Sequence, residues 1–184
     1  MSTPPDWLAA ARAHWAWRGK GRPAFAEEPG PAQESVWDYP RPPILVPDQR
    51  EVSIHWQGRE IARTRHAVRV LETSHPPSFY LPLADVDRQW LEPALGSSFC
   101  EWKGPAQYWT LTDGQQRLER VGWSYPHPLA GAEVLRDRIA FYAHSLDCTV
   151  GGEPVRPQPG GFYGGWITPE LVGPFKGDPG SSAW

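Results

Sequence analysis

Proline and glycine are the residues that most constrain how this chain can fold. The 184 residues include 22 prolines and 18 glycines, which recur along most of the sequence. Proline removes a backbone donor and clashes inside a helix, and glycine weakens helices and strands alike, so long helices are disfavoured. The combined share of the two residues stays below the roughly 25–30% typical of low-complexity chains. The composition therefore favours short strands joined by turns.

Aromatic side chains replace much of the aliphatic surface that a core of this size needs. The chain has 11 tryptophans, 6 tyrosines and 6 phenylalanines. Each large ring buries roughly 150–250 Å² when it packs. The formal net charge of −3 is too small to keep the chain unfolded by self-repulsion. At this length we expect one domain with an aromatic core.

Charge, targeting and cysteine patterns disfavour several classes of protein. A near-balanced charge, with an isoelectric point of about 6.1, gives no general attraction to nucleic acid or to an anionic membrane. The first residues carry no apolar signal, and no aliphatic run could span a bilayer, so we expect a cytoplasmic protein. Cys100 and Cys148 lie far apart without a CxxC pair and are interpreted as reduced thiols. We predict neither a metal nor another cofactor.

The apolar pattern predicts a mainly β (α+β) fold with a helix near each end. Residues 1–33 are expected to form an N-terminal helix, over residues 6–18, and a linker. Residues 34–150 are expected to form the main domain, a single compact antiparallel sheet or barrel-like body with hairpins at Gly58 and at Asp113-Gly114.

The last part of the sequence predicts a second helix and a packed tail. Leu135, Ile139 and Leu146 recur at helical spacing, which predicts a late helix over residues 129–146. Residues 151–184 are rich in glycine and proline, but large apolar side chains are interspersed through them. We therefore expect this tail to pack on the domain.

The first candidate cluster for chemistry surrounds a histidine in front of two prolines. In a strand that starts near residue 68, Arg69 lies on one face while Glu72 shares the other face with apolar neighbours. A carboxylate in such a place needs a partner or a raised pKa, and both are common at functional sites. His75 is held rigidly, as a general base must be. The alternatives are an edge carboxylate paired with arginine, and a corner histidine bonded to the backbone.

The second candidate cluster combines a thiol and an ammonium. Each of the three lysines of the chain precedes a glycine, which lets the backbone turn away while the ammonium points into a pocket. Lys103 is the leading candidate for binding an anionic group, although Lys-Gly also occurs in simple polar turns. Cys100 is a candidate ligand-binding residue, and a nucleophile if Lys103 lowers its pKa; the alternative is a small buried apolar residue.

Five motifs together resemble those of the bacterial and fungal family catalogued as domain of unknown function 427, sometimes labelled nucleotidyltransferase-like. The resemblance covers roughly residues 34–184, including a tail like that of extended members. The motifs are Trp37-Asp38-Tyr39-Pro40; Glu72-Thr73-Ser74-His75-Pro76-Pro77; Tyr80-Leu81-Pro82 with Asp85-Val86; Cys100-Glu101-Trp102-Lys103-Gly104 with Ala106 and Tyr108; and Trp123-Ser124-Tyr125-Pro126.

The resemblance implies a compact, mostly antiparallel β domain with a late helix, in a bacterial protein, and no agreed activity. It also implies a pocket on which matched polar residues converge. We expect aromatic residues such as Trp102 to wall that pocket. The matched polar residues are Glu72, Tyr80, Asp85, Lys103 and Tyr108.

Three functional hypotheses follow. In the first, the domain binds a small molecule, either as a binding protein or as an enzyme acting on an anionic metabolite; Lys103 and Arg69 hold the anion, and Glu72 or His75 handles a proton. In the second, a Trp-rich surface serves protein interaction or self-association, giving a homo-oligomer. In the third, the chain is a metal-assisted or nucleotidyltransferase-like enzyme that uses His75 with carboxylates.

Overall fold

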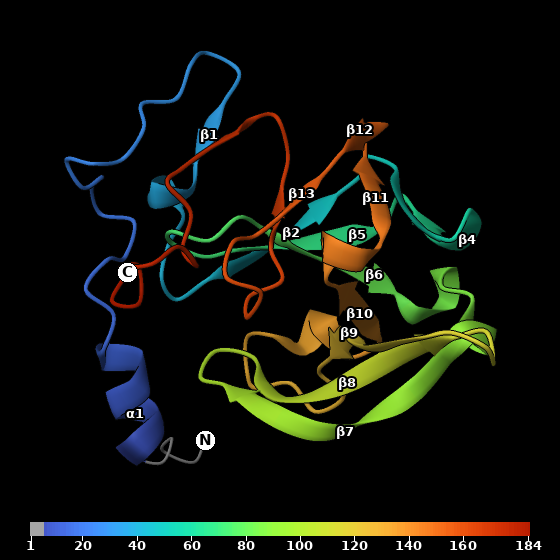
Figure 1. Cartoon of the computed structure of the whole chain (residues 1–184). Coiled ribbons are helices and arrows are strands. Elements are labelled where there is room, and N and C mark those ends of the chain that lie inside the picture. The colour runs from blue at the N-terminus through green and yellow to red at the C-terminus, as the bar shows by residue number, and fades with distance from the viewer. Residues whose placement is uncertain (1–5) are drawn as a thin grey trace.

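The computed structural model describes residues 6–184, and its main feature is an open antiparallel sheet of seven strands (Figure 1). The expected antiparallel β fold is confirmed. The barrel-like form is wrong, because the two edge strands, β2 and β7, do not pair with each other. In spatial order the strands are β2 (Ile44–Asp48), β5 (Ala67–Leu71), β6 (Ser78–Pro82), β10 (Arg138–Phe141), β9 (Arg117–Ser124), β8 (Gly104–Thr112) and β7 (Leu91–Cys100).

A second sheet of four strands packs on one face of the large sheet and encloses the main core. Alternation along β6 directs Phe79 and Leu81 into this core, where they join Ile54 and Trp56 from the small sheet. Hairpins occur at both places where the sequence predicts them, since β3 pairs with β4 and β8 pairs with β9. The small sheet has the order β12 (Glu153–Pro154), β11 (Asp147–Val150), β3 (Val52–Trp56) and β4 (Arg59–Thr64).

The late helix predicted over residues 129–146 is wrong. This stretch contains β10 between two short 3₁₀ helices, η4 (Glu133–Leu135) and η5 (Ala143–Ser145). Ile139 pairs with residues of both β6 and β9, so it is held in extended backbone at the centre of the sheet. Strand pairing therefore overrides a spacing of apolar residues that is compatible with a helix.

The predicted N-terminal helix is present but shorter than expected. Helix α1 spans Asp6–Ala13. From the last turn of this helix, the Arg12 guanidinium donates a hydrogen bond of 2.8 Å to the main-chain oxygen of Glu101, in the turn between β7 and β8. The end of α1 is thereby held against the turn that carries part of the candidate site.

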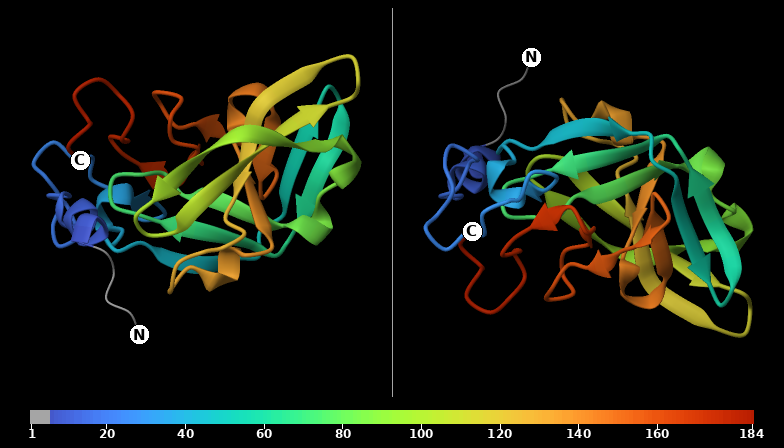
Figure 2. Two further views of the ribbon diagram at one scale, coloured as in Figure 1. Left: turned by 90° about the horizontal axis from the view of Figure 1, so that it is seen from below. Right: turned by 90° about the horizontal axis from the view of Figure 1, so that it is seen from above.

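The C-terminal tail returns along the same end of the molecule as the N-terminal segment (Figure 2). Trp166 is fully buried and stacks on Phe79, while Trp184 stacks on Phe25 from the N-terminal segment. No helix within residues 6–184 has the length and apolar character needed to cross a bilayer. The remaining elements are β1 (Glu34–Ser35) with β15 (Leu171–Val172), β13 (Arg156–Pro157) with β14 (Trp166–Ile167), η1 (Val36–Asp38), η2 (Leu83–Asp85) and η3 (Arg88–Trp90).

Candidate functional site

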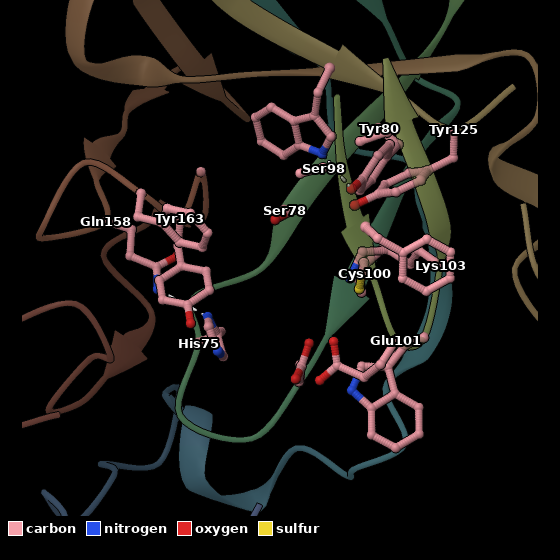
Figure 3. Close-up of a pocket in the computed structure, with 18 of the residues that line it drawn as sticks. His75, Ser78, Tyr80, Ser98, Cys100, Glu101, Lys103, Tyr125, Gln158 and Tyr163 are labelled. Carbon is pink, nitrogen blue, oxygen red and sulfur yellow. Dashed lines mark hydrogen bonds between the residues drawn. The ribbon is translucent and has the colours of Figure 1, made fainter. Parts of the chain in front are cut away.

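A cavity of about 210 Å³ lies on the face of the seven-stranded sheet opposite to the main core (Figure 3). Strand alternation builds this face, because Tyr80 points away from the core that Phe79 and Leu81 enter. The same alternation places Trp123 and Tyr125 together at the end of β9. The lining also includes Trp15 from the N-terminal segment, residues of β5, β7 and β8, and the tail residues Gln158, Phe162, Tyr163 and Gly164.

Lys103 brings an ammonium group to this cavity from the turn between β7 and β8. Gly104 has a φ of +105°, so the backbone turns back here as the Lys-Gly pair predicts. Within residues 6–184 the Lys103 ammonium has no hydrogen-bond partner, and it lies 6.0 Å from the centre of the Tyr125 ring. Burial lowers the pKa of Lys103, but attraction by the ionised forms of its neighbours, Cys100 and Tyr125 first, outweighs burial and raises this pKa well above its ordinary value.

Two tyrosine hydroxyls lie beside Lys103 on the same wall, and Figure 3 shows them close together, pointing into the cavity. The Trp123 indole donates a hydrogen bond of 2.8 Å to the Tyr80 hydroxyl oxygen. An indole N–H can only donate, so the Tyr80 proton is left free to donate. The Tyr125 side chain is 5% exposed, and its hydroxyl lies beside that of Tyr80, where the two hydroxyls can share a hydrogen bond. Burial raises the pKa of Tyr80 and of Tyr125, so both hydroxyls stay protonated at neutral pH.

Two carboxylates, from Glu72 and Glu101, line the same cavity and are each held by one neighbour. Glu72 accepts a hydrogen bond of 3.0 Å from Arg41, whose side chain is fully buried. Glu72 is therefore a cavity-lining carboxylate that is paired with a buried arginine. Glu101 accepts a hydrogen bond of 2.6 Å from the Trp15 indole. Oxygen Oε2 of each carboxylate has no hydrogen-bond partner among residues 6–184.

His75 lies on the opposite wall and is bonded to the tail. The Gln158 amide oxygen accepts from the Gly165 N–H, and its nitrogen donates to the Lys176 carbonyl, which fixes the orientation of the amide. The nitrogen Nε2 of Gln158 also lies 3.0 Å from His75 Nδ1, so Nδ1 must accept and the imidazole proton is on Nε2. Burial, followed by the charge of Arg41, lowers the pKa of His75 well below its ordinary value. His75 is therefore neutral at pH 7 and presents an N–H rather than a lone pair at Nε2.

The cavity brings together seven of the nine residues that the sequence analysis selects, including the pair formed by Glu72 and Lys103. Cys100 contributes a partly buried thiol. The Tyr108 hydroxyl is 2.8 Å from the hydroxyl of Ser98. Trp102 is buried, and its indole N–H has no partner in the described residues. The seven residues are Glu72, His75, Tyr80, Cys100, Trp102, Lys103 and Tyr108.

The other two selected residues, Arg69 and Asp85, lie outside the cavity. Arg69 points to the other side of β5 from Val70, which lines the cavity, and forms ion pairs with Glu34 and Asp48. Asp85 ends η2 and accepts a hydrogen bond from Thr64. Neither side chain can contact a ligand that is bound beside Lys103.

Several lining residues are absent from the sequence-based selection. Tyr125 belongs to a quoted motif and lies two residues after Trp123 in extended backbone, so strand alternation could have identified it. Gln158 and Tyr163 lie in a segment with neither helical nor strand periodicity, and Trp15 follows the end of α1. No local pattern places these three at the site, because they reach it only through tertiary packing.

Comparison with known proteins identifies the family of the chain. Within residues 6–184, no three histidine, cysteine, aspartate or glutamate side chains lie close enough together to hold a metal ion. Comparison with curated proteins finds no match. A family model described as a domain of unknown function, DUF427, matches residues 44–152, which is more than half of the chain. Four of the five motifs lie within the matched residues, and the chain belongs to the DUF427 family.

Proposed function

We propose that the cavity binds a small anionic metabolite and that Lys103 provides the positive charge that holds it. The observation that carries this proposal is an ammonium in an aromatic-lined cavity with no hydrogen-bond partner among residues 6–184. Polar groups inside proteins are normally paired, because an unpaired charge loses its hydration without compensation. An anionic ligand would supply the missing partner.

The size and lining of the cavity support a ligand of metabolite size. Its volume of about 210 Å³ lies below the roughly 300–1,000 Å³ typical of sites for drug-sized ligands. Aromatic rings from Tyr80, Tyr108 and Trp123 form much of the wall. Such rings favour a planar or apolar ligand body, while the few polar groups fix its orientation.

Two observations favour binding over proton transfer as the role of this site. A general base must present a free lone pair to its substrate, but His75 Nδ1 already accepts from Gln158 and Nε2 carries the proton. Glu72 is held by the buried guanidinium of Arg41. We therefore assign neither His75 nor Glu72 the role of a general base and place the main contact with the anion at Lys103.

Thermal-shift measurements with a set of small carboxylates and other metabolites test this proposal. Ligands that bind the folded state raise the melting temperature by mass action. We expect such a rise for the wild type and its loss in Lys103→Met. The variant Lys20→Met is a matched control, because Lys20 also precedes a glycine but is exposed. If ligands stabilise Lys103→Met as much as the wild type, the proposal is wrong.

A further inference from the structure

We infer that the ligand is a small zwitterion, which carries a carboxylate and an ammonium group on an apolar body. This inference rests on the proposed function and adds the second charged group. It follows from the distribution of free donors and free acceptors within one cavity. In Figure 3 the hydroxyls of Tyr80 and Tyr125 lie at one end of the wall, with Cys100 and Lys103 next to them, and Glu101 lies at the other end.

The first end of the cavity presents hydrogen-bond donors. The Lys103 ammonium has no described acceptor, and when the adjacent hydroxyls of Tyr80 and Tyr125 bond to each other, one of their two protons remains free to donate. An ammonium with a neutral hydroxyl donor beside it matches a carboxylate, whose two oxygens accept several hydrogen bonds.

The charges of the lining favour a single negative charge on the ligand. Lys103 is the one lining cation without a hydrogen-bond partner in the described residues, and Glu72 and Glu101 line the same cavity. A doubly charged group such as a phosphate monoester would be attracted by one ammonium and repelled by two carboxylates. In a partly enclosed site this repulsion is stronger than in water, because the effective dielectric constant is lower.

The second end of the cavity presents acceptors. Oxygen Oε2 of Glu72 and of Glu101 is unpaired within residues 6–184, while Oε1 of each carboxylate is bonded to its neighbour. Lys176 is near both carboxylates, but its ammonium donates to the main-chain oxygens of Ser181, Ser182 and Trp184, which uses its three protons. A ligand ammonium would give these free oxygens a charged donor and would offset their negative charge.

A matched set of three probes tests the inference by isothermal titration calorimetry with the full chain. L-Phenylalanine has both charged groups, 3-phenylpropionate lacks the ammonium, and 2-phenylethylamine lacks the carboxylate. We expect phenylalanine to bind most tightly. Loss of either charged group should weaken binding by about tenfold or more, which corresponds to about 1.4 kcal/mol or more per group.

Two variants separate the ends of the site. Glu101→Gln keeps an amide oxygen for the Trp15 indole, so we expect a folded protein with weaker binding of phenylalanine. Binding of 3-phenylpropionate should be unchanged or tighter, because a repelling negative charge is removed. Glu72→Gln is a poorer choice, because it would leave the buried guanidinium of Arg41 without its charged partner. Lys103→Met should weaken the binding of both probes that carry a carboxylate, phenylalanine and 3-phenylpropionate.

The possible outcomes distinguish this inference from the proposed function. Equal affinities for phenylalanine and 3-phenylpropionate would overturn the inference that the ligand is a zwitterion and leave the anion site intact. An affinity for phenylalanine that Glu101→Gln does not change would have the same meaning. Binding of 2-phenylethylamine as tight as that of phenylalanine overturns the anion site itself. Absence of binding by all three probes up to their solubility limits overturns both.

Discussion

The two walls of the cavity differ in how their polar groups are used. On the strand wall, which carries Tyr80, Lys103, Trp123 and Tyr125, the Lys103 ammonium has no hydrogen-bond partner in the described residues. On the tail wall, Gln158 makes three hydrogen bonds, to His75, Lys176 and Gly165. A satisfied network holds a wall in place, whereas unsatisfied donors cost stability unless a ligand pairs with them. The difference indicates that the tail wall has a structural role and the strand wall a binding role.

The largest effect on stability is expected for Gln158→Leu. This variant keeps a similar volume but removes the partner of three groups, the buried Gly165 N–H, the Lys176 carbonyl and His75 Nδ1. Each orphaned group costs about 1–3 kcal/mol, so the free energy of unfolding should fall by about 3 kcal/mol or more. Urea denaturation monitored by tryptophan fluorescence measures this change. A loss smaller than that caused by removing a polar group from the strand wall would contradict the comparison.

The next effect is expected where the tail meets the strand wall. A Cβ at Gly164 would lie 2.1 Å from the Trp123 ring, and this ring bonds to Tyr80. Gly164→Ala must therefore displace the tail or the indole, at a cost of about 1–3 kcal/mol. We expect a lower melting temperature and weaker carboxylate binding, measured on the same sample. Unchanged values of both would show that the tail does not pack here as described.

His75 makes the free energy of unfolding depend on pH. Because its pKa is lowered by folding, the unfolded chain binds a proton that the folded chain rejects once the pH falls below about 6.5. Stability is therefore lost as the pH falls, with a slope of up to about 1.4 kcal/mol per pH unit from this one group.

A pair of histidine variants measures that contribution. The slope of unfolding free energy against pH, between neutral pH and the acid limb, should decrease in His75→Gln. It should persist in the matched variant His127→Gln, since His127 is exposed. Equal slopes in all three proteins would mean that His75 does not titrate as its surroundings require.

The smallest effect on stability is expected on the strand wall, for Tyr125→Phe. Removal of the Tyr125 hydroxyl leaves Tyr80 still bonded to the Trp123 indole, so no group loses its last partner and the free energy of unfolding should change by less than about 0.5 kcal/mol. Binding of 3-phenylpropionate should nevertheless weaken, because one of its donors is lost. A large loss of stability without a change in binding would assign Tyr125 a structural role.

Much of the strand wall can be predicted from sequence, because strand periodicity decides which side chains share a face. Periodicity also shows that Arg69 and Glu72 point to opposite faces, so Arg69 could have been rejected as a partner of Glu72. The late helix shows the limit of such patterns. The spacing of Leu135, Ile139 and Leu146 fits a helix, but the pairing of Ile139 with two strands decides its conformation.

The tail wall could not be predicted, since its residues reach the site through packing between distant segments. Gln158 contacts His75 across 83 residues of sequence, and Trp15 contacts Glu101 across 86. The three Lys-Gly pairs show the same limit. Lys20 is exposed, Lys103 lines the cavity, and Lys176 is buried against main-chain oxygens. A local motif fixes the turn, but tertiary structure decides what the ammonium meets.

These three lysines also allow the most direct test of the central assignment. Lysine labelled with ¹³C at Cε gives three side-chain signals, from Lys20, Lys103 and Lys176. Addition of 3-phenylpropionate to the wild-type protein should shift the Lys103 signal in a saturable manner and leave the other two in place. A saturable shift of Lys176 alone, or a titration in which the Lys103 signal does not move, would contradict the assignment of Lys103 as the group that holds the anion.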